Sequence, residues 1–312
     1  MSYPNKLYLR EVGLREGIQS SDKNPTVQER LQLIKELSLT GISEIEVGSF
    51  VRPDLVPQMS CIDELCSALP AEEKKVRYSA LYLNKKGFLK ALAHKSLSTE
   101  GWLYFSLCET FSKQNYKKTF SELLTAVPDW LSLFKENKVP FKGVVLSCSF
   151  GSNWQGEIPA KKALTYLNKI ADVLPALSNS TIVLADTMGW ASPKSTKEYI
   201  KLLQKEFPAS CLWLHIHDTR GLGLTSAYEA LMLGVLHFDL SLGGSGGCPF
   251  AKGASGNIAT EDFLYLCKTL GINTSVNLEK YLELAVKFEE LIGQENLSGR
   301  CYKVYKRLSK LY

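Results

Sequence analysis

Short runs rich in β-branched and aromatic residues recur along the chain, with amphipathic segments between them. Such runs predict β-strands, and they cover residues 6–13, 43–50, 76–83, 102–108, 141–150, 181–187, 212–219 and 238–244. Between the first two runs, residues 26–41 place Leu31, Ile34, Leu37 and Ser38 on one face of a helix. Strands that alternate with helices in this way predict an α/β protein.

Proline and glycine mark where the predicted helices begin and end. Pro159 and Pro193 suit the start of a helix, whereas Gly41 and Gly234 suit the position just after the last turn. Eight strand-and-helix repeats within this chain length predict a (β/α)8 TIM barrel. A doubly wound open sheet is the alternative architecture.

We predict a single catalytic domain that spans residues 1–312, because no linker of low complexity interrupts the chain. The barrel takes about residues 6–275. An additional C-terminal helical segment takes about residues 277–312, beginning with a helix near 277–293. The basic and aromatic end of the chain is explained by a solvated terminal helix.

The composition, 45% hydrophobic and 22% charged, is that of an ordinary globular protein without an apolar run of membrane length. The net charge of +5 is mild, and no motif points to a nucleic-acid partner. Eight scattered cysteines are typical of reduced thiols. Together with a start that lacks secretory and transit features, they predict a cytoplasmic protein with no membrane partner.

Polar residues gather at the carboxyl ends of the predicted strands, where barrels of this class build their active sites. These positions are Arg15, Glu16, Glu46, Ser49, Asn84, Ser147, Cys148, Asp186, His215 and His217. Each residue alone has a structural explanation, such as a helix cap, a turn or a buried hydrogen bond. For Asp186, capping of the following turn is the alternative. Together they predict a barrel mouth lined by acids, an arginine and two imidazoles.

Two of the four histidines, His215 and His217, stand one residue apart in the stretch WLHIHDT. In a strand, side chains at this spacing leave the backbone on the same face. The pair is therefore either two separately satisfied core histidines or half of a metal site. A six-coordinate divalent cation would also need oxygen donors, which Glu16 or Glu46 supplies as a carboxylate and Asn257 as an amide.

A glycine-rich segment, GGSGGCPFAKGASGN, ends at Asn257. Its glycines allow positive φ and a close approach to a ligand, so we expect a lid over the substrate; a plain flexible loop is the alternative. Cys248 at its centre is an acid–base candidate beside a metal, with inert packing as the alternative. The predicted lid residues are Gly246, Gly247, Cys248, Pro249 and Gly253.

Five motifs carry a family resemblance. GGSGGCPFAKGASGNIATEDFLYL is similar to GGCPYAxGASGNxATEDxxY, EVGSFVRPDLVPQM to SFVSPxxVPQM, LADTMG to GDTIG, and HIHDTRG to HCHDTYG. VVLSCSFGSNWQGEIP resembles SCxxGCPYEG, with Ser152, Asn153 and Trp154 substituted. These patterns are those of the 3-hydroxy-3-methylglutaryl-CoA lyase family, in the DRE-TIM metallolyase superfamily. The resemblance runs from about residue 6 to about residue 290. Related Claisen-type synthases lack the cysteine loop, which favours a lyase.

The resemblance implies a carbon–carbon lyase that cleaves 3-hydroxy-3-methylglutaryl-CoA to acetyl-CoA and acetoacetate, products of leucine degradation and ketone-body formation. It implies an acyl-CoA substrate as the partner. It also implies a divalent metal cation, Mg²⁺ or Mn²⁺, and no organic cofactor. A homodimer is a hypothesis that rests only on the common association of such barrels.

The residue roles that the resemblance implies fall into three groups. The implied metal ligands are Glu16, His215, His217 and Asn257. The implied catalytic residues are Arg15 for enolate stabilisation, Glu46 for metal-site geometry, Asp186 and His215 for removal of the hydroxyl proton, and Cys248 as a proton donor or shuttle from the lid. The candidate substrate-binding residues are Arg15, Gln19, Ser49, Asn84 and Ser147.

The loop after the first predicted strand departs from the family pattern. It reads VGLREGIQS instead of VGPRDGLQN, with differences at Leu14, Glu16, Ile18 and Ser20. Glu16 lengthens a metal donor by one methylene, and the same loop shapes the acyl pocket. One alternative is therefore a paralogous lyase for another 3-hydroxyacyl-CoA, such as citramalyl-CoA or a longer branched acyl-CoA. A second alternative, motivated only by Glu16, is a catalytically impaired barrel with a binding role.

Overall fold

The structure is a computed structural model that describes residues 6–70, 76–247, 256–295 and 297–309. These residues divide into two compact units. Unit 1 comprises the described residues up to 99 and those in the ranges 238–247 and 256–309, and unit 2 comprises residues 100–237. The sequence-based division into a single domain stays a prediction.

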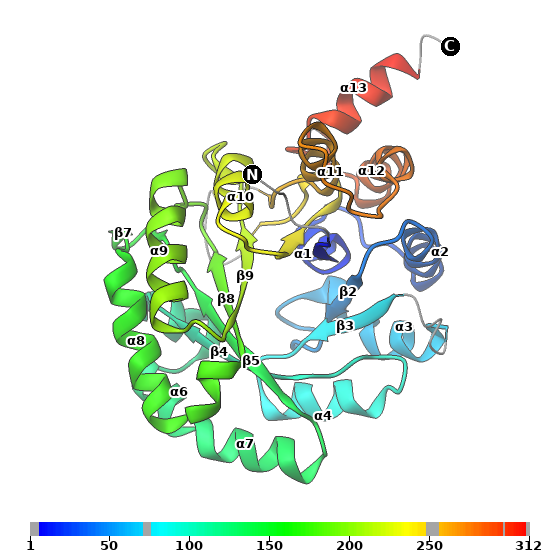
Figure 1. The fold of residues 1–312 in the computed structure, drawn as a ribbon. Helices are drawn as coiled ribbons and strands as arrows, with labels where there is room; N and C mark the ends of the chain where they lie inside the picture. Colours follow the sequence, from blue (N-terminus) through cyan, green and yellow to red (C-terminus); the bar gives the residue numbers. More distant parts are fainter. Residues whose placement is uncertain (1–5, 71–75, 248–255, 296, 310–312) are drawn as a thin grey trace. The chain divides into compact units, whose positions relative to one another are not determined.

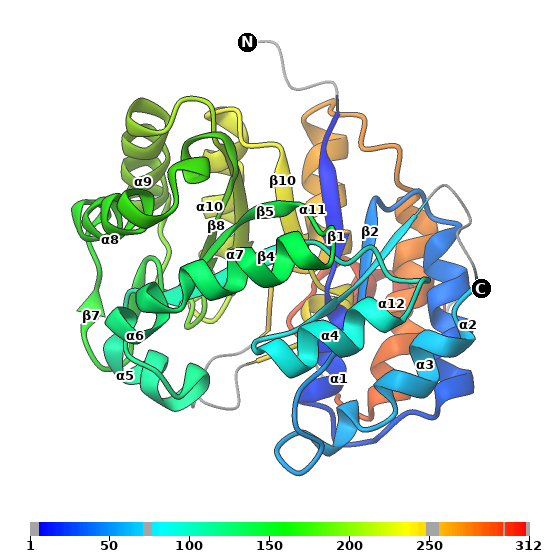
Figure 2. The ribbon, with the colours of Figure 1, turned by 90° about the horizontal axis from the view of Figure 1, so that it is seen from below.

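Unit 1 contains four strands in the order β3-β2-β1-β10, and β1, β2 and β3 pair in parallel. Its strands are β1 (Tyr8–Glu11), β2 (Glu44–Ser49), β3 (Arg77–Leu81) and β10 (His237–Leu240), of which the first residue is counted in unit 2. Its helices are α1 (Gly13–Gln19), α2 (Val27–Ser38), η1 (Pro57–Met59), α3 (Ile62–Ala68), α4 (Lys85–Ala93), η4 (Leu242–Gly244), α11 (Thr260–Thr269), α12 (Leu278–Ile292) and α13 (Cys301–Leu308). Helices α2 and α3 pack against the outside of β2 (Figure 2), and all residues of that strand are buried.

Unit 2 contains four strands in the order β9-β8-β5-β4, all parallel, and a short antiparallel hairpin. Its strands are β4 (Gly101–Ser106), β5 (Phe141–Ser147), β6 (Gly151–Ser152), β7 (Gly156–Glu157), β8 (Thr181–Asp186) and β9 (Cys211–Ile216). Its helices are α5 (Glu109–Phe111), η2 (Ser112–Tyr116), α6 (Phe120–Thr125), α7 (Val127–Glu136), α8 (Ala160–Val173), η3 (Pro175–Asn179), α9 (Pro193–Glu206) and α10 (Gly223–Met232). Helices α7, α8 and α9 lie on the outside of this sheet (Figure 1).

The eight predicted strands are all present, and with their helices they make up the eight repeats of a (β/α)8 barrel, so the predicted fold class is confirmed. The C-terminal helical segment is present as α12 and α13. Pro193 is the first residue of α9, and Ser192 caps that helix. Gly41 and Gly234 follow α2 and α10 with φ of 92° and 84°, a left-handed conformation that glycine adopts without strain.

The segment after β1 was expected to be a loop, and this expectation is wrong, because residues 13–19 form α1. Leu14 and Ile18, four residues apart, are both fully buried on one face of that helix. The hairpin of β6 and β7 was also not predicted, since its strands are only two residues long. Among the described residues, every helix is too short or too polar to cross a membrane.

Candidate active site

Arg15 lies between two carboxylates in unit 1. Its position just after β1, on the first turns of α1, places it beside β2. Its Nε donates to Glu46 Oε2 at 2.5 Å, and its Nη1 donates to Glu16 Oε1 at 2.6 Å. Burial lowers the pKa of Arg15, but the charges of Glu16 and Glu46 outweigh this effect and raise the pKa above its ordinary value. Arg15 is therefore a permanent cation with a fixed orientation.

Glu16 and Asn257 meet in unit 1 although 241 residues separate them. The Asn257 amide donates through Nδ2 to Glu16 Oε2 at 2.8 Å and to the Ser245 carbonyl at 3.0 Å. Its Oδ1 is buried and has no hydrogen-bond partner within the described part of the chain. A buried oxygen acceptor without a partner carries a desolvation cost, which a bound cation would remove. Glu16 and Asn257 thus fit the oxygen donors of a divalent-metal site.

Gly246 closes over this pair in unit 1. Its φ is +115°, and a Cβ at this position would lie 2.6 Å from Asn257 Nδ2 and 3.0 Å from the Glu16 Cβ. A side chain would therefore displace the amide from Glu16. Position 246, predicted to belong to the lid, therefore requires a glycine, because there is no room for a side chain beside the candidate ligands Glu16 and Asn257.

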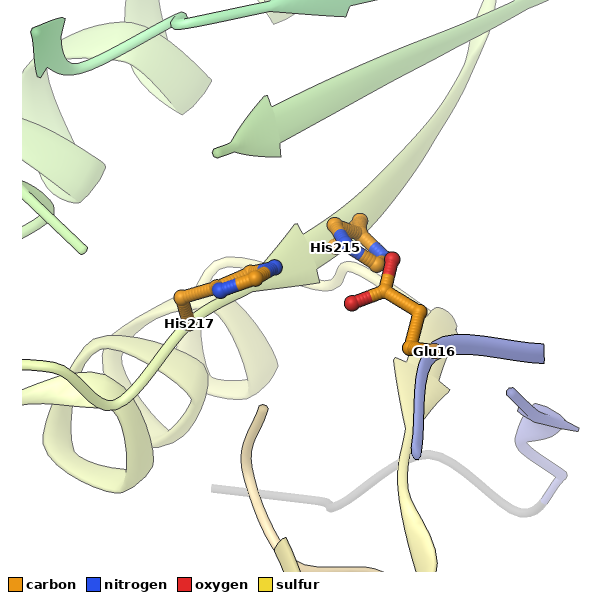
Figure 3. Close-up of side chains that lie close together, drawn as sticks. All are labelled: Glu16, His215 and His217. Atoms are coloured by element: carbon orange, nitrogen blue, oxygen red, sulfur yellow. The ribbon is translucent and has the colours of Figure 1, made fainter. Parts of the chain in front are cut away.

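His215 and His217 lie at the carboxyl end of β9 in unit 2 (Figure 3). Their ring centroids are 5.3 Å apart, and both residues are buried. The expectation that they share a face is confirmed, because rings on opposite faces of a strand could not lie this close. Figure 3 also shows Glu16, which comes from α1 of unit 1. Glu16 and the two histidines are each of a residue type that can ligate a metal ion.

Asp186 ends β8, the strand next to β9 in unit 2, and is fully buried. Its Oδ1 accepts the Trp190 N–H at 2.7 Å and its Oδ2 accepts the Ala191 N–H at 2.9 Å. Burial raises the pKa of Asp186 to about 6, while these two N–H groups and the nearby His217 and His215 act in the opposite direction. The carboxylate caps the turn, as the structural alternative proposed, and its raised pKa also suits a proton acceptor.

The candidate substrate-binding residues have different surroundings. In unit 1, Ser49 is buried at the end of β2, and its Oγ has no hydrogen-bond partner among the described residues. Gln19 is the last residue of α1, and Asn84 caps α4 by accepting the Gly87 N–H at 2.8 Å. In unit 2, the Ser147 hydroxyl lies 2.6 Å from the Tyr116 hydroxyl. Substrate binding by these residues stays a prediction.

The structure describes only two of the five predicted lid residues. Gly246 and Gly247 have φ of 115° and 159°. Cys248, Pro249 and Gly253 lie outside the described residues. The acid–base role of Cys248 therefore stays a prediction.

Several side chains at the carboxyl ends of the unit 2 strands were not predicted from the sequence. Trp190 follows β8, Arg220 follows β9, and the two are stacked with the guanidinium carbon 4.2 Å from the ring centroid. Tyr116, the partner of Ser147, comes from η2. A tryptophan and an exposed arginine in loops after barrel strands are the signals that would have identified the first two.

Comparison with known proteins agrees with this geometry. The family model HMGL-like matches residues 6–287. The chain belongs to the HMGL-like family. A hydroxymethylglutaryl-CoA lyase from Bacillus subtilis is 34% identical over 306 residues, which cover 98% of this chain and 99% of the relative. Family membership thus extends over all eight barrel repeats.

Two further proteins are similar to this chain over most of its length. A 3-hydroxy-3-isohexenylglutaryl-CoA/hydroxymethylglutaryl-CoA lyase from Pseudomonas aeruginosa is 33% identical over 95% of this chain and 96% of its own length. The structure of an HMG-CoA lyase from Acinetobacter baumannii, in complex with coenzyme A and 3-methylmalate, has a TM-score of 0.84 and 30% identity. It covers 96% of this chain and 95% of its own.

Proposed function

We propose that this protein is a 3-hydroxy-3-methylglutaryl-CoA lyase, a carbon–carbon lyase that releases acetyl-CoA and acetoacetate. The observation that carries the proposal is the arrangement in unit 1, where the Arg15 cation lies against Glu16 and Glu16 lies against Asn257. In an HMGL-like chain, these residue types are the ones needed to bind a cation and to stabilise an enolate.

The proposed cofactor is a divalent metal cation, with no organic cofactor. Unit 1 would contribute the oxygen donors of Glu16 and Asn257, and unit 2 the imidazoles of His215 and His217. Carboxylate, amide and imidazole donors together suit Mg²⁺ or Mn²⁺. When bound, such a cation lowers the pKa of a coordinated hydroxyl and fixes its orientation.

Proton removal from the tertiary hydroxyl is assigned to Asp186 with His215. A carboxyl with a pKa of about 6 is ionised at neutral pH. Its pKa is also close enough to neutral pH for the group to take up and release a proton. As the hydroxyl proton leaves, its electron pair forms the ketone of acetoacetate. The bond between the second and third carbons breaks, and its electron pair becomes the enolate of acetyl-CoA.

Arg15 is assigned to the enolate oxygen. Its orientation is set in advance by Glu46, so the cation meets charge that develops only as the carbon–carbon bond breaks. Glu46 holds Arg15, and this contact is the means by which it supports the site. Protonation of the enolate carbon by Cys248, from the lid, completes the reaction.

A lyase for a longer branched 3-hydroxyacyl-CoA is the second candidate. It is favoured by the relative from Pseudomonas aeruginosa whose name joins isohexenylglutaryl-CoA and hydroxymethylglutaryl-CoA. No observation favours the impaired barrel, since Glu16 keeps both Arg15 and Asn257 as hydrogen-bond partners. A cytoplasmic location and a homodimer complete the proposal.

The test is acetyl-CoA release from a panel of 3-hydroxyacyl-CoA thioesters. The protein is freed of metal with a chelator and assayed with and without added Mg²⁺ or Mn²⁺. We expect turnover of 3-hydroxy-3-methylglutaryl-CoA that depends on the added cation. Preference for a longer branched ester would select the second candidate, and no turnover of any ester with saturating cation would overturn both.

A further inference from the structure

The turn after β8 carries both hydrogen-bond donors of the Asp186 carboxylate. One oxygen accepts from Trp190 N and the other from Ala191 N, at 2.7 Å and 2.9 Å. The orientation of the carboxylate therefore follows the position of these two backbone N–H groups. We propose that Trp190 and Arg220 are positioning residues that clamp this turn and so hold Asp186 in place for proton removal. The proposal rests on the proposed lyase function.

Arg220 holds the turn in two ways. Its guanidinium carbon lies 4.2 Å from the centroid of the Trp190 ring, a cation–π contact. Its Nη1 also donates to the carbonyls of Met188 and Gly189, at 2.9 Å and 2.8 Å. One exposed side chain from the loop after β9 thus spans the turn from Met188 to Trp190.

The hairpin of β6 and β7 also holds the Trp190 ring. Trp190 Nε1 donates to Asn153 Oδ1 at 3.0 Å. A Cβ at Gly151 would lie 2.6 Å from the Trp190 Cγ, so the ring packs directly on the glycine backbone. The indole is therefore fixed by a hydrogen bond and by packing, as well as by Arg220.

The turn after β8 is itself closely packed. Gly189 has a φ of +65°, and a Cβ there would lie 2.5 Å from the Thr219 side chain. Beyond Ala191 the chain enters α9, which Ser192 caps. Movement of the Trp190 ring would thus shift the amides of Trp190 and Ala191 and turn the carboxylate.

The clamp acts alongside the groups that already face Asp186. His215 and His217, at the end of β9, lower the pKa of Asp186 through their charge. The charge of Asp186 in turn raises the pKa of Tyr199 on α9. Arg220 adds no hydrogen bond to the Asp186 carboxylate, so its contribution is to geometry. It stands at the tyrosine position of the HCHDTYG pattern, and Asn153 is one of the substituted residues of the SCxxGCPYEG pattern. The clamp therefore joins positions at which this chain departs from the family motifs.

The experiment compares Arg220→Ala, Arg220→Lys and Trp190→Phe with the parent protein and with Lys205→Ala, which removes an exposed cation from the end of α9. Steady-state kinetics with 3-hydroxy-3-methylglutaryl-CoA and saturating Mn²⁺ give kcat and KM separately. Hydrogen–deuterium exchange of the segment 186–191 reports on the Trp190 and Ala191 amides without reference to activity. Circular dichroism confirms that each variant is folded.

We expect Arg220→Ala to lower kcat by about 10- to 100-fold with KM nearly unchanged, because a small misplacement of a catalytic group has effects of this size. Amide exchange in the segment 186–191 should become faster. Arg220→Lys should recover part of kcat, since it keeps the cation over the ring. Trp190→Phe loses the indole N–H and one of the two fused rings but keeps an aromatic face for Arg220, so it should lose less. Lys205→Ala should match the parent.

Unchanged kcat and unchanged exchange in Arg220→Ala would overturn the clamp while leaving the lyase function intact. A rise in KM with kcat retained would also overturn it, because Arg220 would then bind substrate directly. A parent protein without turnover would overturn the lyase function and, with it, the catalytic meaning of the clamp. The two failures are therefore distinguishable.

Discussion

In unit 1 the candidate catalytic cation, Arg15, is held by the side-chain carboxylates of Glu16 and Glu46, whereas in unit 2 the carboxylate of Asp186 is held by two backbone N–H groups. Both groups are largely buried, and burial opposes the charged form of each. Around Arg15, opposite charges outweigh burial and raise the pKa of the guanidinium further. Around Asp186, burial prevails and raises the pKa of the carboxyl to about 6.

The difference matches the roles proposed for Arg15 and Asp186. A group that stabilises an enolate must stay charged throughout, and a guanidinium between two carboxylates does so. A group that takes up a proton must be able to change its charge near neutral pH. Backbone N–H groups orient the Asp186 carboxylate without adding a full opposite charge, which would lower its pKa toward its ordinary value.

The largest effect is expected from removing the cation of unit 1. Arg15→Gln should lower kcat by about 10²–10³-fold, because no fixed charge then meets the enolate. Arg15→Lys keeps the charge but not the planar fork that contacts Glu16 and Glu46, so it should recover only part of the loss. Steady-state kinetics at saturating cation measure both. A kcat for Arg15→Gln within threefold of the parent would contradict the assigned role.

The next effect tests the histidines of unit 2. His217→Ala should lower metal affinity and activity together, by at least about 10-fold each, because one imidazole ligand is lost. Metal content after gel filtration is measured by atomic emission. His94→Ala, which removes an imidazole from unit 1 that pairs with Asp63, is the matched control and should retain the metal. Parent-like metal content in His217→Ala would remove this residue from the ligand set.

A smaller effect is expected from the length of the carboxylate at position 16. Glu16→Gln removes the charge and should weaken metal binding by about 10-fold. Glu16→Asp keeps the charge but shortens the reach toward Asn257, so we expect metal binding to survive and kcat to fall by about threefold. Titration of the metal-free variants with Mn²⁺ measures the first effect. Equal metal affinity in parent and Glu16→Gln would defeat the assignment.

The smallest effect concerns Glu11, a buried carboxyl in unit 1. Burial raises the pKa of Glu11 to about 7, against hydrogen bonds from Thr260, Leu242 and Gly13. Its contribution to stability is therefore fully present below about pH 4.5 and is lost as the pH rises through 7. Between pH 6 and 8 we expect a loss of about 1 kcal/mol. Urea unfolding measures it, and a parallel pH profile in Glu11→Gln would show that another group is responsible.

Local patterns were enough to predict the eight strands, the (β/α)8 fold and the shared face of His215 and His217. These features depend on spacings of two to four residues, which the sequence displays directly. The types of the candidate site residues were also readable, because active sites of this fold gather at the carboxyl ends of the strands. Helix α1 escaped prediction, because the burial of Leu14 and Ile18 is decided by the elements packed around it.

Partnerships between distant residues were decided only by the tertiary structure. Glu46 contacts Arg15 because β2 lies beside β1, and Asn257 contacts Glu16 across 241 residues. The stacking of Arg220 on Trp190 needs the loops after two neighbouring strands to meet. Contacts of this kind depend on strand order and register. The pattern of hydrophobic positions within one segment specifies neither the order nor the register. The sequence alone therefore determined which groups are available, and the packing of strands and loops determined which of them act together.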